Sequence, residues 1–374
     1  MKCNHESTKA RSLKYSDSFS CFRVFVVAFW VKLFLPAAVL LAAIACERHI
    51  APGAEPRLVE RTHATMGTEV TVTAWTADEA AVVAAFTAVF AEFDRLDALM
   101  SVWRDGSDVT RLNAAAGQHA VAVSPEVREV LAVARQVSEW TGGRFDVTFG
   151  VLSGLWKFDN QDKDDSVPDR REVLARLPLI NYRDVEVDER AGTAYLKRRG
   201  MRAHLGGIGK GYAVDRAVTL LRSRGFSDFM VQAGGDLYVA GRRGDRPWRL
   251  GIRDPRGPAD KSFAALDLTD GTFSTSGDYE RFFIKDGRRY HHILDLSSGE
   301  PARDCRSVTL VTEQAVIADA LAKGVFILGP EAGMALIERL PKVEGVIVSA
   351  KNEVLISSGL KKRLMLLAPP TDAP

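Results

Sequence analysis

The stretch HLGGIGKGYAVD, from His204 to Asp215, places four glycines within six residues, just before an apolar pattern of helical period. Glycines in such a loop let backbone amides approach an anion closely, and the helix that follows points its N-terminus at negative charge. The loop is not a Walker loop, because no Ser or Thr follows Lys210, and it lacks the GxGxxG spacing of dinucleotide sites. It therefore predicts either an anion-binding turn or a plain strand-to-helix turn with a solvated lysine.

The segments around this loop alternate between helical and strand-like hydrophobic periods. The helix that the loop opens is predicted from near Gly209 to Gly225. Thr68–Trp75 alternates with period two and predicts a strand, after which Thr76 and Glu79 form a capping box for another helix. The apolar face of that helix is predicted at Val82, Phe86, Val89, Phe93 and Leu96.

The rest of the chain continues this mixture. A helix is predicted from Ser124 and Pro125 to Thr141–Gly143, and the polar stretch Asp159–Arg170 is predicted as a surface loop. Short strands fill Asp228–Ser297 and predict one antiparallel sheet. Together these elements predict an α+β fold of mixed, largely antiparallel sheets packed with helices. Further predicted elements are a strand over Ser307–Thr312, helices over Glu313–Leu328 and Pro330–Leu340, and a terminal hairpin of GVIVSA and EVLIS.

The composition is that of an ordinary soluble globular protein, since 46% of the 374 residues are hydrophobic and 26% are charged. It argues against a disordered chain, a collagen and a multi-pass membrane protein. The length predicts two domains or one large one. Because the formal net charge is only +2, the chain has no field that would collect polyanions, and we expect no nucleic-acid partner.

The first 46 residues have the order of an export signal. Basic residues precede an apolar run from Val24 to Ala45, which ends in AAIAC with Cys46 last. Small residues before a cysteine are typical of bacterial lipoprotein signals, in which that cysteine is acylated after cleavage. The alternative is an uncleaved membrane anchor, since the run is long enough to cross a bilayer of about 30 Å. Both hypotheses place the following residues outside the cytoplasmic face.

Three further segments carry candidate functional side chains. In QAGGDLYVAG, paired glycines precede Asp236 and predict either the close approach of a backbone or ligand, or a plain bulge. YHHILDL places His291, His292 and Asp295 on one strand, where the two adjacent histidines point to opposite faces, and one of them can be a plain core or surface histidine. Asp319 lies in the first turn of a predicted helix, where it either binds a cation or a donor, or simply complements the helix N-terminus.

Taken together, these segments resemble the ApbE family, the FAD:protein FMN transferases once described as thiamine biosynthesis lipoproteins. The motifs follow the family order and cover nearly the whole chain after the signal, and a lipoprotein signal is itself usual in that family. The matching motifs are MGTEVTV from Met66, SVWRDGSDVTRLN from Ser101, GGRFDVTFGVL from Gly142, LGGIGKGYAVD, QAGGDLY, TSGDYERFF, HHILDLSSGEPA, and SVTLV with IADALA.

The resemblance implies a reaction at the pyrophosphate of FAD, in which a threonine or serine hydroxyl of an acceptor protein attacks the FMN phosphorus and AMP leaves. Such a reaction is of the phosphoryl-transfer type and calls for a divalent cation, here Mg²⁺, a positioned base and a cradle for the flavin. The implied base is His292, and the implied metal ligands are Asp319 and the carbonyl of Gly207. The implied flavin nucleotide contacts are Met66, Trp103, Arg144, Phe145, Asp146, His204, Lys210 and Ile293.

The chain departs from the family pattern at several of these positions. His204 stands where the family usually has aspartate, Trp103 where it has tyrosine, and Lys323 where it has a threonine metal ligand. Lys323 follows Asp319 by four residues, so both lie on one helix face. The lysine therefore either occupies the cation position as a point charge or points away and leaves magnesium fewer ligands. Leu296 and Ser297 also replace a proline and a basic residue.

The resemblance further implies a domain organisation, a location and a partner. We expect a signal peptide with a lipoprotein-type cleavage site over 1–46, a tether over 47–56, a flavin transferase domain of two closely packed subdomains over 57–362, and a tail over 363–374. The expected location is the periplasmic face of the inner membrane, with attachment through lipid at Cys46. The expected acceptors are membrane subunits of redox complexes that carry a Ser/Thr motif.

Three alternatives to the transferase remain open at this point. Water in place of the acceptor hydroxyl would make the protein an FAD pyrophosphatase that releases FMN and AMP. The substitutions at His204 and Lys323 are compatible with a flavin-binding lipoprotein with weak or no transfer. A zinc hydrolase would use His204, His291 and His292, although adjacent strand histidines diverge and no zinc signature is present.

Overall fold

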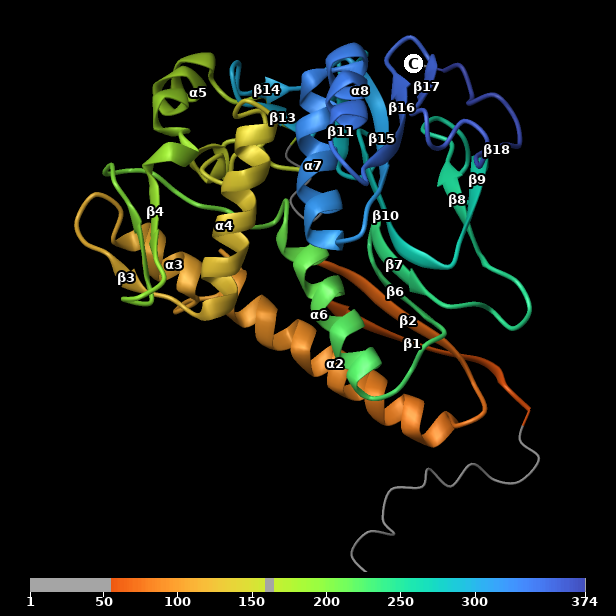
Figure 1. The fold of residues 1–374 in the computed structure, drawn as a ribbon. Coiled ribbons are helices and arrows are strands. Elements are labelled where there is room, and N and C mark those ends of the chain that lie inside the picture. Colours follow the sequence, from red (N-terminus) through yellow and green to blue (C-terminus); the bar gives the residue numbers. More distant parts are fainter. Residues whose placement is uncertain (1–54, 159–164, 374) are drawn as a thin grey trace, which may run out of the picture. The chain divides into compact units, whose positions relative to one another are not determined.

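The computed structural model describes residues 55–158 and 165–373 (Figure 1). The predicted signal over 1–46 and its Cys46 lie outside these ranges, as do most of the predicted tether and residues 159–164 of the predicted loop. In the described part of the chain, none of the helices has the length and hydropathy that a membrane span requires.

An antiparallel sheet of eight strands forms the centre of the described domain. Its order is β1-β2-β6-β7-β10-β15-β16-β17, and every neighbouring pair runs antiparallel. The predicted α+β class is confirmed, as are the predicted strand at Thr68 and the terminal hairpin. The strands span β1 (Arg57–Thr65), β2 (Thr68–Thr76), β6 (Phe229–Ala233), β7 (Asp236–Ala240), β10 (Asp270–Gly277), β15 (Cys305–Val311), β16 (Glu344–Ser349) and β17 (Val354–Ile356).

Helices cover one face of this sheet (Figure 1). The helix α2 packs on β1 and β2, α6 on β6 and β7, α7 on β7, β10 and β15, and α8 on β16, while α4 packs on α7. The apolar face predicted for α2 is fully buried, because its period of three and four residues matches the helical turn. These helices span α2 (Glu79–Met100), α4 (Pro125–Trp140), α6 (Gly209–Ser223), α7 (Ala315–Leu328) and α8 (Pro330–Arg339).

Two predicted helix starts differ from the structure. The capping box of Thr76 and Glu79 is wrong, because Asp78 is the N-cap of α2 and its carboxylate accepts from the amide of Ala81. The Thr76 hydroxyl accepts from the Asp78 amide instead. A carboxylate suits this position because it also complements the helix dipole. The start of α7 is Ala315, two residues later than predicted.

The opposite face of the central sheet packs on a second sheet of three strands, in the order β18-β9-β8. In β16, Val346 and Val348 belong to the apolar cluster between the two sheets, whereas Ile347 belongs to the cluster under the helices. This alternation follows from the two-residue period of a strand. The prediction of one sheet over Asp228–Ser297 is therefore wrong, since its strands divide among four sheets. The added strands are β8 (Trp248–Arg253), β9 (Ser262–Leu268) and β18 (Met365–Leu366).

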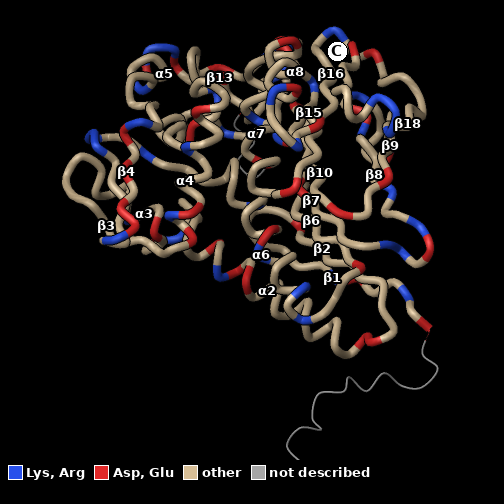
Figure 2. Tube along the Cα trace, in the orientation of Figure 1, with Lys and Arg blue, Asp and Glu red and all other residues tan. Residues whose placement is uncertain are grey.

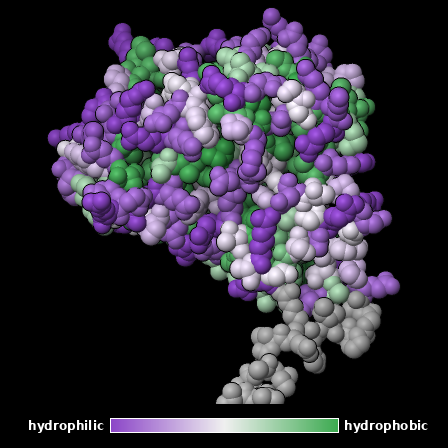
Figure 3. Space-filling view, viewed as in Figure 1, coloured by the Kyte–Doolittle hydropathy of each residue, from purple (hydrophilic) through white to green (hydrophobic). Residues whose placement is uncertain are grey.

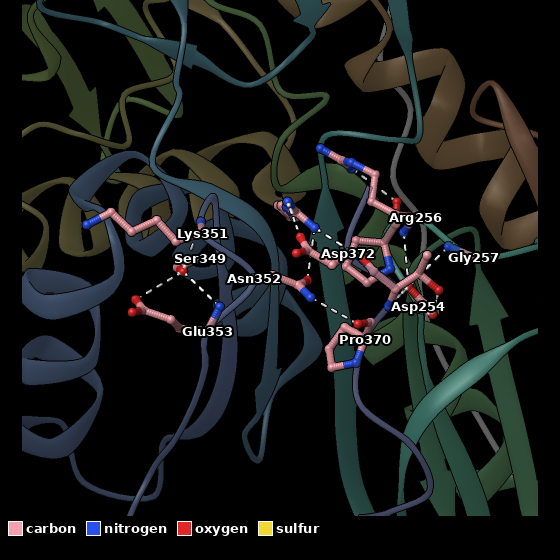
Figure 4. A network of polar contacts seen from close by, with 12 residues as sticks. Asp254, Arg256, Gly257, Ser349, Lys351, Asn352, Glu353, Pro370 and Asp372 are labelled. Atoms are coloured by element: carbon pink, nitrogen blue, oxygen red, sulfur yellow. Dashed lines mark hydrogen bonds and ion pairs between the residues drawn. The ribbon is translucent and has the colours of Figure 1, made fainter. Parts of the chain in front are cut away.

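Residues 363–373 of the expected tail lie against this second sheet. The strand β18 pairs with β9, and the buried carboxylate of Asp254 accepts from the amide and the hydroxyl of Thr371. Asn352 donates from its side chain to the carbonyl of Pro370 at 2.9 Å. Figure 4 shows these contacts converging between the loop after β8 and the end of the chain, so polar side chains hold the segment in place.

Short elements complete the domain around α4 and α7. The predicted helix from Ser124 is confirmed, with the Ser124 hydroxyl accepting from the amide of Val127. A stacked aromatic cluster of Trp156, Phe158, Phe283 and Tyr290 joins the loop after α4 to the β11–β12 hairpin. The elements are α3 (Asp108–Ala114), β3 (Val121–Ala122), η1 (Gly150–Leu152), α5 (Arg170–Arg176), η2 (Leu177–Leu179), η3 (Tyr182–Asp184), β4 (Val185–Asp188), β5 (Thr193–Leu196), β11 (Phe282–Lys285), β12 (Arg288–His291), β13 (Leu294–Asp295) and β14 (Glu300–Pro301).

Charges of both signs alternate along the described trace, and no long segment carries one sign (Figure 2). The face in Figure 3 is mostly hydrophilic, with hydrophobic residues in separate patches. Among the described residues, Trp103 has the largest exposed fraction of any large hydrophobic side chain, 75%. An indole that is so exposed on a largely polar surface is a candidate for contact with a ligand or partner.

Candidate functional site

The buried carboxylate of Asp319 lies where the start of α6 meets α7. Its Oδ2 accepts a 2.9 Å hydrogen bond from the amide of Gly211, and its Oδ1 pairs with the ammonium of Lys323. The ammonium of Lys210 lies 3.7 Å from the same Oδ1. Burial by itself would raise the pKa of Asp319, but the charges of Lys210 and Lys323 and the two hydrogen bonds hold that pKa below its usual range.

Asp319 was predicted in the first turn of its helix, but it is the fifth residue of α7 and lies in the second turn. Its partners are two lysine side chains and the amide of Gly211. The alternative prediction, that Asp319 simply complements the N-terminus of its own helix, is therefore wrong. The N-terminus of α7 is satisfied by Asp215 instead, whose carboxylate accepts from the amides of Ala315 and Val316. Asp215 thus joins α6 to α7 one turn after Gly211.

The glycine of α6 that bonds Asp319 is required by the close packing of the two helices. A Cβ added to Gly211 would lie 2.2 Å from the carbonyl oxygen of Ala315 and 2.7 Å from Cβ of Asp319. No side chain fits at such distances, so only glycine allows α6 to approach α7 closely enough for the hydrogen bond. The predicted glycine-rich turn therefore also serves helix-to-helix contact.

Lys210 connects this carboxylate to a second one on the central sheet. Its ammonium lies 2.9 Å from Oδ2 of Asp236, the first residue of β7, and the Ser274 hydroxyl of β10 donates to the other oxygen. Burial would lower the pKa of Lys210, but Asp236 and Asp319 together raise it above its usual value. The lysine is therefore fully charged, and the plain hypothesis of a solvated lysine is wrong.

The paired glycines before Asp236 bring backbone close to backbone. A Cβ on Gly235 would lie 2.5 Å from the carbonyl oxygen of Thr275, so β7 approaches the neighbouring strand more closely than a side chain allows. Gly234 has φ of +60°, in the left-handed region that glycine adopts at little cost, and Cε of Lys210 would lie 4.0 Å from its Cβ. Of the two predicted explanations, close backbone approach is the one that the structure supports.

The two adjacent histidines have different surroundings. His291 ends β12, its Nε2 lies 2.7 Å from the carbonyl oxygen of Ala302, and its Nδ1 accepts from the amide of Ile293. It also packs edge-on against Phe326 in the core. His291 is thus the plain core histidine that was one of the predicted alternatives. Both of its ring nitrogens have hydrogen-bond partners, so neither is free to bind zinc.

His292 lies in a break between β12 and β13, not on one continuous strand as predicted. Its amide donates to the carbonyl of Arg281, which would be the next pair of the β11–β12 register after Phe282 and His291, and β12 ends at His291. Its Nδ1 is buried and has no hydrogen-bond partner among the described residues. Burial, together with the charges of His291, Lys323 and Arg281, lowers the pKa of His292 to about 3, so the ring is neutral at ordinary pH.

Met66 turns the chain from β1 into β2 and has φ of +51°, while Arg281 donates to the carbonyl of the following Gly67 at 3.1 Å. The Met66 side chain also lies near the start of α6, since its Cε would be 3.8 Å from a Cβ on Gly209. A groove of about 650 Å³ opens beside this turn. Its lining residues are His63, Ala64, Thr65, Met66, Gly67, Thr68, Asp94, Asp97 and Arg104.

Four other predicted contacts lie around α7 and the loop before α6. Phe145 is buried beside Gly207, and Arg144 pairs with Asp295 at 3.2 Å. Both carboxylate oxygens of Asp146 accept hydrogen bonds within the protein, one from Thr148 and the other from the amide of Tyr182, so Asp146 joins its loop to η3. Burial lowers the pKa of His204 to about 4, and the positive charge of Arg281 lowers this pKa further.

The remaining two predicted contacts differ most in exposure. Ile293 is buried in the main core cluster, whereas Trp103 is largely exposed and next to Arg104 of the groove. The structure thus brings Lys210, Asp319 and Lys323 into direct contact, places His292 within reach of the charge of Lys323, and leaves Trp103 at the surface.

Magnesium prefers an octahedral set of oxygen ligands. Here Oδ2 of Asp319 is used by Gly211, Oδ1 is used by Lys323, and the Asp319 carbonyl also accepts from Lys323 at 2.8 Å. Gly207, the predicted backbone ligand, faces the stem of that lysine. Among the described residues, no group of three or more His, Cys, Asp or Glu side chains is placed to hold a metal ion. As arranged, the Asp319 site does not fit magnesium.

Lys210, Lys323, Asp236 and Asp319 form the centre of the candidate site. The sequence patterns do not predict the roles of three residues in and around this centre. The paired glycines single out Asp236 but do not identify it as the partner of Lys210, and the sequence patterns give no role to Ser274 or Asp215. A signal for Asp215 was present, because it follows Gly211 by four residues and so lies on the same face of α6. No sequence signal links Ser274 to Asp236, since the two meet only through strand pairing.

Comparisons with known proteins find similar sequences and similar folds. An FAD:protein FMN transferase of Treponema pallidum (strain Nichols) is 34% identical over 307 residues, which cover 77% of this chain and 83% of that protein. One of Klebsiella pneumoniae (strain 342) is 31% identical over 299 residues, covering 80% and 91%. The crystal structure of the ApbE protein of Thermotoga maritima matches with a TM-score of 0.76 at 32% identity, covering 82% of this chain and 99% of that one.

The flavin transferase ApbE of Vibrio cholerae matches with a TM-score of 0.75 at 28% identity, again covering 82% and 99%. The profile of the ApbE family itself matches residues 66–347, which include the glycine-rich loop, both lysines, both histidines and both buried carboxylates of the centre. This chain belongs to the ApbE family.

Proposed function

We propose that this protein is an FAD:protein FMN transferase, which transfers FMN from FAD to a threonine or serine hydroxyl of an acceptor protein and releases AMP. The observation that carries the proposal is the meeting of the α6 N-terminus and two ammonium groups at Asp319, together with a neutral buried histidine whose pKa the charge of Lys323 lowers. This set of groups suits a pyrophosphate and a nucleophilic hydroxyl. Relatives named FAD:protein FMN transferase support the same assignment.

In the proposed reaction, the acceptor oxygen forms a bond to the FMN phosphorus while the bond from that phosphorus to the bridging oxygen breaks. AMP leaves with the bridging oxygen, and the proton of the hydroxyl goes to a ring nitrogen of His292. The neutral ring can accept it, because its pKa of about 3 keeps it unprotonated before substrate binds. A bound pyrophosphate would raise that pKa through its negative charge and so make the ring a stronger base.

Lys210 and Lys323 supply positive charge next to the proposed position of the pyrophosphate. Both ammonium groups are already held by buried carboxylates, so little reorganisation is needed as negative charge develops. The magnesium dependence that the resemblance implies is not a step of this proposal, because the Asp319 site does not fit the ion. The proposal is thus a phosphoryl-type transfer in which the protein's own cations face the phosphates.

We also propose that the protein works at the periplasmic face of the inner membrane on membrane subunits of redox complexes. The support is the sequence pattern of the apolar run from Val24 to Ala45 followed by Cys46. A lipid at Cys46 predicts that the Cys46→Ser variant loses metabolic labelling with a fatty acid. Label that survives this substitution would contradict attachment at Cys46. Absence of label in the native protein would contradict the lipoprotein proposal and leave the uncleaved anchor.

The test of function incubates the full-length purified protein with FAD and an acceptor domain that carries a Ser/Thr motif. We expect covalent FMN on the acceptor by mass spectrometry, with one AMP released for each flavin attached. An acceptor whose hydroxyl residue is replaced by alanine is the control. AMP and free FMN without attachment would favour the pyrophosphatase, and retained FAD without AMP would favour the flavin-binding lipoprotein.

A further inference from the structure

The side chain of Lys323 covers the one carboxylate that the resemblance assigns to a metal ion. Its ammonium contacts both Oδ1 and the main-chain carbonyl of Asp319, one helical turn earlier on α7. Asp319 is fully buried, whereas the Lys323 side chain keeps 18% of its surface exposed. Of this pair, the lysine is therefore the partner that reaches solvent, and an approaching anion would meet it before the carboxylate.

Each buried carboxylate of the centre has an ammonium partner within the protein. Two buried carboxylates, Asp236 and Asp319, face two ammonium groups, Lys210 and Lys323. Lys210 is nearer to Asp236, at 2.9 Å, than to Asp319, at 3.7 Å, whereas Lys323 contacts Asp319 directly, so the two lysines share the charge of Asp319. Without Lys323, Asp319 would keep only the charge of Lys210, which Asp236 shares, and a buried carboxylate with so little counter-charge is costly and creates a demand for a cation.

The packing around the lysine stem holds the ammonium in this position. A Cβ on Gly207 would lie 3.2 Å from Cδ of Lys323 and 3.4 Å from Cε2 of Phe145. The stem is therefore enclosed by the glycine-rich loop and by an aromatic ring, and the glycine leaves the space that the stem fills. Lys323 also acts on the proposed base, since its charge is one cause of the lowered pKa of His292.

We propose that the ammonium of Lys323 is a built-in cation that takes the place of a divalent metal ion at Asp319, so that this chain binds FAD there without metal. The inference rests on the proposed function, which identifies FAD as the ligand. In it, Lys323 is a positioning residue whose charge faces the pyrophosphate. One positive charge tethered to α7 neutralises Asp319 and remains available to the phosphate oxygens from its exposed side.

The first test measures FAD affinity by fluorescence titration of the full-length protein in EDTA and in excess Mg²⁺. We expect the affinity of the native protein to be the same in both. The Lys323→Thr variant should bind FAD about tenfold or more weakly in EDTA, because a buried charge is uncovered, and should recover in Mg²⁺. Lys197→Thr, which removes a surface lysine paired with Glu186 on β4, should behave like the native protein.

A native protein that loses FAD affinity in EDTA and regains it in Mg²⁺ would overturn the inference, and so would a Lys323→Thr variant with native affinity in EDTA. Lys323→Gln serves as a second variant if the threonine variant does not fold, because its neutral amide keeps much of the stem. It should bind FAD weakly in EDTA without full recovery in Mg²⁺.

The second test needs no flavin and separates this inference from the proposed function. Mn²⁺ is titrated into the metal-free protein and followed by electron paramagnetic resonance. We expect no Mn²⁺ site that depends on Asp319 in the native protein, and a new one in Lys323→Thr that Asp319→Asn abolishes. Mn²⁺ bound by the native protein and lost in Asp319→Asn would overturn the inference. Absence of FAD binding under every condition would instead contradict the proposed function.

Discussion

The amide of Gly211 on α6 donates a 2.9 Å hydrogen bond to Oδ2 of Asp319 on α7. This bond links the two segments that the sequence marked most clearly, the glycine-rich loop and the acidic residue inside an apolar helix. It uses an amide from the first turn of α6, where backbone donors have no partner within the helix. The start of α6 is thereby fixed against the carboxylate that also holds Lys210 and Lys323.

The first prediction concerns the bare Cα of Gly211. Gly211→Ala places a Cβ where the carbonyl oxygen of Ala315 would be 2.2 Å away, so α6 and α7 must separate. We expect a loss of about 1–3 kcal/mol in the free energy of unfolding, typical of overpacking, or more because backbone must shift. Chemical denaturation measures it, and FAD affinity should fall in the same variant because the lysines move with the helices.

The control for this variant lies two residues earlier in the same helix. A Cβ on Gly209 would meet only the side chains of Met66 and Met100, each at 3.8 Å, and Gly209 does not have a positive φ. Gly209→Ala should therefore leave stability unchanged or raise it slightly, since alanine favours a helix. If both variants lost stability equally, the close approach of the helices at Gly211 would not be the cause.

Local sequence patterns predicted much of this fold because they report short-range physics. The apolar period of α2 and the Ser124 cap of α4 are each settled within one helical turn, and both agree with the structure. The division of the strands among several sheets was not predictable in this way. Both faces of β16 are apolar, and the strand pattern does not indicate which face meets the helices and which meets the second sheet.

The centre shows the same limit. The spacing of four residues predicts that Lys323 lies on the same helix face as Asp319, but it does not indicate whether the lysine contacts the carboxylate or points away. The structure decides for contact, because Gly207 and Phe145 enclose the stem from a distant part of the chain. The strand pattern also does not predict the break at His292, because it does not indicate where pairing with β11 stops and pairing of β13 with β14 begins.

The second prediction concerns His292 as the proposed base. His292→Ala should lower kcat of FMN transfer by about 10²–10⁴-fold, the usual contribution of a positioned base, and leave FAD affinity near the native value. Because the pKa of His292 is lowered to about 3, the ring stays neutral as pH falls through 6.5. We therefore expect kcat/KM, which reports the free enzyme, to show no loss near pH 6.5 from this group.

The matched control is His119, an exposed histidine before β3. His119→Ala should keep both kcat and its pH profile. In contrast, kcat itself reports the complex, where the pyrophosphate charge raises the pKa of His292, so its acid limb should lie at higher pH than that of kcat/KM. Coincident limbs in kcat and kcat/KM would argue that His292 does not face the phosphates.

The third prediction concerns Asp254, which fastens the C-terminal segment. Burial would raise its pKa, but hydrogen bonds from Thr371, from the Arg256 amide and from Lys261 hold it well below its usual range. Because the folded state favours the carboxylate, this stabilisation is complete above the ordinary pKa of 3.8 and is lost as pH falls below it. Asp254→Asn should cost about 1–3 kcal/mol at pH 7 and flatten the decline in acid, as measured by thermal unfolding across pH.

Asp260→Asn is the control for this change, because it alters an exposed carboxylate of the same loop between β8 and β9. It should keep the native pH dependence. If Asp254→Asn lost stability in acid as steeply as the native protein does, other carboxylates would be the main cause of that loss.

The last prediction concerns Trp103, whose ring is 75% exposed next to Arg104 of the groove beside Met66. If the isoalloxazine or adenine ring stacks on this indole, FAD should quench tryptophan fluorescence in proportion to binding. Trp103→Ala should then weaken FAD binding about 2–12-fold, because aromatic pairs contribute about 0.5–1.5 kcal/mol beyond buried area. Trp103→Phe should recover most of the affinity, since a smaller ring still stacks. Ile284→Ala, another exposed apolar side chain in the β11–β12 hairpin, should bind FAD as the native protein does, and an equal loss in both variants would show that general surface hydrophobicity, not stacking, is measured.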